Sequence, residues 1–175
     1  MKIFAGLLAL FAVATAGSAG AGVAAVGNTD PASAVWVSDP GGDGTQVDAG
    51  LPVGYRNPRS AEEAVRWALG QVGVNRDTGH CLRFVNLAYG RPSGPPSAYL
   101  VWTRSNPNLH RFTGPPPRGS VVVWSNAIGG GHGHIGVSLG DGTMVSTTSG
   151  AVSILSIKGY ADSAYFGWMP PYFYM

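Results

Sequence analysis

Three helices are predicted in the first half of the chain, where apolar residues recur three and four positions apart. The first begins after Ser60, which opens a capping box of the Ser-x-x-Glu type, and its apolar stripe ends at Gly73. The second opens at or just before Cys81 and stops at Gly90. A third, short helix is predicted at about residues 97–104.

From residue 115 onward the pattern changes to short β-branched and alternating runs, which predict strands. A compact buried run spans residues 120–124, and a glycine-rich loop at 129–133 leads into a second strand at 134–139. Asp141-Gly142 is typical of a tight hairpin turn. The remaining strands are predicted at 143–147, at 151–157 and in the aromatic segment 165–174. Helices followed by antiparallel strands predict an α+β fold in which N-terminal helices pack on an antiparallel β-sheet.

The N-terminal segment predicts export. A lysine at position 2 is followed by an apolar run over residues 3–16 and by small-x-small triplets, so residues 1–27 are expected to be a signal peptide or a membrane anchor. The membrane-anchor interpretation remains possible because no further charged residue appears until Asp30. Residues 28–59 are rich in Gly, Pro and Asp and predict a flexible linker, which leaves 60–175 as the folded domain. We expect a secreted or cell-wall-associated protein, or else a membrane-anchored one that faces away from the cytoplasm.

Composition narrows the function classes. Hydrophobic residues make up 45% of the 175 residues and charged residues 11%, which favours a buried core over disorder. The formal net charge of +2, without a basic stripe, argues against a nucleic-acid partner. No cofactor is predicted, and the oligomeric state is not readable from the sequence.

Cys81 is the first candidate for chemistry, because one cysteine in an exported chain cannot form an internal disulfide. A predicted helix N-terminus presents free N–H groups and the positive end of the helix dipole, which favour the nucleophilic thiolate. Two other interpretations stay open at this point: a partner in an intermolecular disulfide and a small buried packing residue.

His134 is the second candidate. It follows a glycine loop at the predicted start of a strand, where a histidine can face a nucleophile on a helix end as the base of a Cys–His pair. The two residues are 134 − 81 = 53 positions apart, as expected for groups that meet only in the fold. A surface or turn histidine is the plain alternative.

A metal site is a weaker interpretation of the same region. His132 and His134 form a His-x-His pair that, with His80 or His110, would supply imidazole ligands. Since no acidic residue or second cysteine has ligand spacing, we predict no metal. Asp141 is expected to serve the hairpin turn rather than catalysis.

Three segments resemble one enzyme group. Residues 79–90 (GHCLRFVNLAYG) resemble the nucleophile helix of the NlpC-type and CHAP-type cell-wall cysteine peptidases. Residues 117–124 (PRGSVVVW) are similar to the strand before their histidine, and residues 133–145 (GHIGVSLGDGTMV) are similar to their histidine hairpin. The resemblance covers roughly residues 60–170 in the same order.

This resemblance implies a papain-like α+β domain that binds peptidoglycan and cleaves an amide bond through an acyl-enzyme, with Cys81 as nucleophile and His134 as base. It places Ser146 where these families usually carry a His, Asn or Glu that orients the histidine. A hydroxyl accepts a hydrogen bond but carries no charge to stabilise an imidazolium. An inactive wall-binding or assembly module on the same fold is therefore the main alternative, and an unrelated α+β domain is the other.

Overall fold

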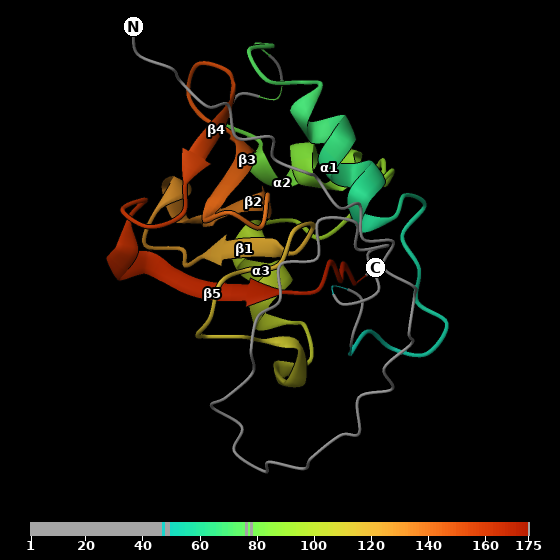
Figure 1. Ribbon diagram of the computed structural model, residues 1–175. Coiled ribbons are helices and arrows are strands. Elements are labelled where there is room, and N and C mark those ends of the chain that lie inside the picture. The colour runs from blue at the N-terminus through green and yellow to red at the C-terminus, as the bar shows by residue number, and fades with distance from the viewer. Residues whose placement is uncertain (1–46, 48–49, 76, 78, 175) are drawn as a thin grey trace, which may run out of the picture. The chain divides into compact units, whose positions relative to one another are not determined.

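The structure is a computed structural model that describes residues 47, 50–75, 77 and 79–174 (Figure 1). The predicted signal peptide or anchor (1–27) and most of the predicted linker (28–59) lie outside these described residues. Within the described part, no helix has the length and apolar character needed to cross a membrane.

The three predicted helices are confirmed as α1 (Ala61–Leu69), α2 (Cys81–Ala88) and α3 (Ala98–Thr103). The capping box at α1 is present: Ser60 Oγ accepts a hydrogen bond from the Glu63 N–H at 3.3 Å, and Glu63 Oε2 accepts one from the Ser60 N–H at 2.8 Å. α1 ends before the predicted position because the chain turns through residues 70–73. The short 3₁₀ helices are η1 (Pro107–Leu109), η2 (Gly129–Gly131) and η3 (Asp162–Ala164).

Five strands form one sheet in the order β4-β3-β2-β1-β5 (Figure 1). They are β1 (Val121–Trp124), β2 (His134–Ser138), β3 (Thr143–Thr147), β4 (Val152–Ser156) and β5 (Tyr165–Met169). Every pairing is antiparallel. β1 to β4 form a meander, and β5 returns to the other side of β1. The predicted α+β class, with helices packed on an antiparallel sheet, is confirmed.

β1 is an interior strand of the sheet, between β2 and β5, and is buried along its whole length. Val121 and Val123 join the core that the helices share with the sheet, whereas Val122 and Trp124 join a second cluster on the opposite face. This explains why the strand is a continuous apolar run rather than an alternating one, since both of its faces are covered. β1 and its neighbour β2 are thereby fixed in position beneath α2 and α3.

Residues 55–59, the C-terminal end of the predicted linker, contact the folded domain. Tyr55 Oη accepts a hydrogen bond from the Phe173 N–H at 2.8 Å, and Asn57 Nδ2 donates to the Pro171 carbonyl at 2.7 Å. Arg59 Nη1 donates to the carbonyl of Leu87 in α2 at 2.6 Å. These described residues therefore pack on the domain, while the predicted boundary at residue 60 stays a prediction.

Candidate active site

The loop before α2 sets Cys81 at the first position of that helix. Gly79 has a φ of +73°, which glycine adopts without strain, and the His80 N–H donates to the Asp77 carbonyl at 2.7 Å. The Asp77 carboxylate then pairs with Arg83 of α2 at 3.1 Å, with the Asp77 side chain only 5% exposed. The loop is thus tied to the first turn of the helix, and Cys81 is held at the helix N-terminus.

The glycine loop before β2 places His134 at the first position of that strand. His134 pairs across the sheet with Trp124, the last residue of β1. Gly133 has a φ of +76°, and a Cβ there would lie 2.5 Å from the Trp124 carbonyl oxygen and 3.1 Å from the Tyr99 nitrogen. Only glycine lets the chain pass between β1 and α3 at this point.

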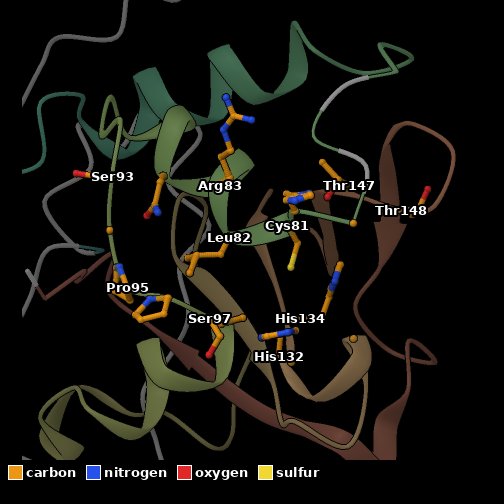
Figure 2. Close-up of a pocket in the computed structure, with 18 of the residues that line it drawn as sticks. Cys81, Leu82, Arg83, Ser93, Pro95, Ser97, His132, His134, Thr147 and Thr148 are labelled. Atoms are coloured by element: carbon orange, nitrogen blue, oxygen red, sulfur yellow. The ribbon is translucent and has the colours of Figure 1, made fainter.

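Cys81 and His134 line one cavity of about 670 Å³. Figure 2 shows the Cys81 sulfur and the His134 ring directed into the same space from α2 and from β2. The rest of the wall comes from the first turns of α2, the proline-rich segment 92–98, the loop that holds His132, the turn after β3 and Tyr160. The two residues that sequence analysis selects from segments 53 positions apart are thus brought to one site.

Burial keeps Cys81 in the thiol form. Removal from water raises the pKa of the Cys81 thiol above its ordinary value, and the backbone N–H groups of Ile135 and Leu82 lower the pKa only in part. The helix N-terminus by itself predicts a stabilised thiolate. In the structure, loss of hydration outweighs that effect.

His134 is a neutral imidazole at pH 7. Its side chain is buried, with 7% exposed, and burial lowers the pKa of His134 from 6.5 to about 4. Its Nε2 is buried and has no hydrogen-bond partner among the residues that the structure describes. The site therefore holds an uncharged thiol beside an uncharged imidazole, which is the protonation state that a base needs before it accepts a proton.

Ser146 lies on β3 but does not line the cavity. Its fully buried hydroxyl donates to the Ile135 carbonyl at 2.6 Å, and the described residues include no hydrogen bond from it to the His134 ring. Its hydroxyl supports the backbone next to His134 instead. The role that the resemblance gives to Ser146 stays a prediction that this geometry does not favour.

The other three histidines lie in two different parts of the structure. His80 and His132 line the cavity, whereas His110 lies away from it, stacked on Trp102 at a ring distance of 3.9 Å and 2.8 Å from the Ser105 hydroxyl. Across the described part of the chain, no three His, Cys, Asp or Glu side chains are grouped so that they would hold a metal ion. Asp141 accepts a hydrogen bond from the Thr143 N–H at 2.9 Å within the hairpin turn.

Three residues that line the cavity are not among the catalytic candidates predicted from the sequence. Asn86 and Thr147 are buried and each has an unpartnered side-chain oxygen, while Tyr160 packs its ring against His134 with centroids 4.8 Å apart. Asn86 sits within a helical pattern that predicts only packing. Thr147 and Tyr160 belong to a strand end and a loop, where neither spacing nor residue type marks a site.

No protein-family model matches the chain, and no curated protein matches it. Among solved structures, the chain is similar to the peptidoglycan hydrolase RipB from Mycobacterium tuberculosis, with 20% identity and a TM-score of 0.43 over 66% of this chain and 65% of that one. It is also similar to a mutated form of the resuscitation promoting factor interacting protein RipA, with 17% identity and a TM-score of 0.44 over 75% of this chain and 65% of that one. The chain thus spans just under two thirds of each. Because both TM-scores are below 0.5, neither likeness carries a functional argument.

Proposed function

We propose that this chain is a cysteine hydrolase that cleaves an amide bond of the cell-wall peptide, with Cys81 as nucleophile and His134 as base. The observation that carries the proposal is the shared cavity: a free cysteine at a helix N-terminus and a neutral, buried histidine at a strand end meet there. Nucleophile and base contributed by distant segments are the arrangement that thiol catalysis requires.

The protonation states of Cys81 and His134 determine the order of the reaction steps. As the Cys81 sulfur attacks the amide carbonyl, its proton passes to the neutral imidazole of His134, so that a free thiolate need not form beforehand. The imidazolium then gives that proton to the leaving amine, and the acyl group stays on the sulfur as a thioester. Water hydrolyses the thioester with His134 again accepting a proton, which restores the thiol. Backbone N–H groups at the start of α2 are placed to stabilise the negative charge on the carbonyl oxygen.

Peptidoglycan as substrate follows from the three sequence blocks that resemble cell-wall cysteine peptidases. Among the described residues that line the cavity there is no Asp or Glu, and Arg83, the cation that lines it, is already paired with Asp77 at 3.1 Å. The same blocks and the apolar N-terminal segment support a secreted or wall-associated location, with a membrane-anchored form as the alternative.

A wall-binding module without hydrolytic activity is the second candidate, and two observations favour it. Within the described part of the chain the Nε2 of His134 has no hydrogen-bond partner, and the Ser146 hydroxyl donates to the Ile135 carbonyl. A histidine without a polar orienting group loses part of its catalytic efficiency in enzymes that depend on one.

The two candidates are separated by product analysis. The full chain, with Cys81→Ala and His134→Gln beside it, is incubated with purified peptidoglycan under reducing conditions, and products are read by mass spectrometry. We expect new fragments from the parent alone, and their masses identify the bond. Sedimentation with peptidoglycan by all three proteins, without fragments from any, would support the binding module instead.

A further inference from the structure

The imidazole of His134 is surrounded by aromatic rings. The rings of Trp124 and His134 form a T-shaped, edge-to-face pair with centroids 5.7 Å apart and planes at 62°, and the ring of Tyr160 lies 4.8 Å from the imidazole at 34°. Trp124 and Tyr160 also contact each other at 5.1 Å and 74°. The three rings therefore form one mutual cluster around the proposed base.

Backbone structure holds both of the rings that contact His134. Trp124 is the cross-strand partner of His134 in the β1–β2 pairing and is fully buried. Tyr160 belongs to the turn after β4, where its N–H donates to the Ile157 carbonyl at 3.3 Å and the Gly159 N–H donates to Asp162 Oδ1 at 2.7 Å. The sheet thus holds one ring and a hydrogen-bonded turn holds the other.

Aromatic rings provide two effects that a polar orienting residue normally provides. They restrict rotation of the imidazole by close packing, and their negatively polarised faces attract a cation. In the proposed reaction His134 becomes a cation when it accepts the Cys81 proton, and it returns to neutral when it gives that proton to the leaving amine. The attraction therefore acts only while the proton is on the imidazole, where it offsets part of the loss of hydration that lowers the pKa of His134.

Resting on the hydrolase function proposed above, we propose that Trp124 and Tyr160 form an aromatic clamp that positions the imidazole of His134 and stabilises its protonated form in place of a hydrogen-bonding third residue. The clamp residues are positioning residues, and the proton transfer itself involves Cys81, His134 and the substrate. The unpartnered Nε2 of His134 is consistent with this assignment, because the ring is held by contacts that need no hydrogen bond.

The titratable groups around His134 come from three segments. Cys81 faces it from α2, His132 lines the same cavity from the preceding loop, and Tyr160 contacts it from the turn after β4. Tyr165 of β5 contacts the indole of Trp124, with ring centroids 5.0 Å apart. Burial raises the pKa of Tyr160, as does the charge that Cys81 carries as a thiolate, so the phenol is neutral at pH 7 and sits within electrostatic range of the sulfur.

The test compares Tyr160→Phe, which keeps the ring, with Tyr160→Leu, which keeps an apolar side chain but removes the ring. Tyr172→Leu is the control, because Tyr172 packs on an aromatic ring, that of Tyr55, with centroids 4.8 Å apart, but does not line the cavity. We expect Tyr160→Leu to lower kcat on peptidoglycan on the order of tenfold with little change in KM. Tyr160→Phe is expected to restore most of the parent kcat, and Tyr172→Leu to keep the parent kcat.

A second measurement tests the clamp even if the protein does not cleave peptidoglycan. NMR relaxation of the His134 ring carbons reports how tightly the imidazole is held, and we expect increased ring motion in Tyr160→Leu but not in Tyr160→Phe. If Tyr160→Leu does not fold, Tyr160→Phe with a fluorinated ring keeps the shape and weakens the cation-attracting face, which should lower kcat below that of Tyr160→Phe. Unchanged kcat and unchanged ring motion in Tyr160→Leu, or equal kcat with and without ring fluorination, would overturn the clamp. The parent protein could instead lack hydrolytic activity while its His134 ring is ordered and becomes more mobile in Tyr160→Leu. That result would refute the hydrolase function and support the positioning role.

Discussion

Acidification is the perturbation that tests the buried state of His134. Folding holds the pKa of His134 at about 4, whereas the unfolded side chain titrates near 6.5. Between these values the unfolded chain binds a proton that the folded chain refuses, so stability is lost as the pH falls from 6.5 toward 4. From pH 7.5 to pH 4.5 the loss is about 2.5 kcal/mol, calculated from the two pKa values by proton linkage. For a urea slope of about 2 kcal/mol per M, the unfolding midpoint should fall by about 1 M.

The assay is urea unfolding followed by circular dichroism at several pH values, for the parent and for His134→Phe. The variant keeps a buried ring but has no group to protonate at this position, so it should lose about 2.5 kcal/mol less than the parent over the same range. Other groups, such as His110 and the carboxylates of Glu62 and Asp141, are present in both proteins and cancel in the comparison. Equal losses in parent and variant would refute the buried, neutral histidine on which the proposed base depends.

Three further predictions concern single residues in or near the site. Iodoacetamide at pH 7 should label Cys81 more slowly than a free thiol, because burial raises the pKa of the Cys81 thiol; faster labelling, followed by mass spectrometry, would contradict this. Ser146→Ala should cost about 1 kcal/mol of unfolding free energy, because the Ile135 carbonyl loses its partner, and should keep peptidoglycan cleavage per folded molecule within about twofold. A tenfold loss of cleavage in that variant would instead give Ser146 a catalytic role. Gly133→Ala should cost about 2 kcal/mol or more in urea unfolding, since its Cβ would lie 2.5 Å from the Trp124 carbonyl oxygen at a positive φ; parent-like stability would show that the loop has room for it.

The helices and strands could be predicted because their signals are local. The Ser60 capping box starts α1 as predicted, and the continuous apolar run at 121–124 follows from a strand with both faces buried. The place of β5 could not be predicted in this way. It pairs with β1, some 40 residues earlier, and no local pattern specifies that partner.

The same distinction between local and long-range information applies to the candidate site. Cys81 and His134 could be selected because residue type, helix start and glycine loop are each readable in the sequence. The thiolate expected at a helix N-terminus was not found, because burial depends on what the fold packs around the sulfur. Tyr160 was missed for a similar reason: only the turn after β4 brings its ring to His134.

The most direct measurement is the initial rate of peptidoglycan cleavage by the full chain and by Cys81→Ala, counted as newly released amino groups at equal concentrations of folded protein. Circular dichroism confirms beforehand that the two proteins fold alike. The proposed mechanism predicts release by the parent and a loss on the order of a thousandfold or more in Cys81→Ala, because the acyl-enzyme cannot form without the sulfur. Equal release by both proteins would contradict catalysis by Cys81.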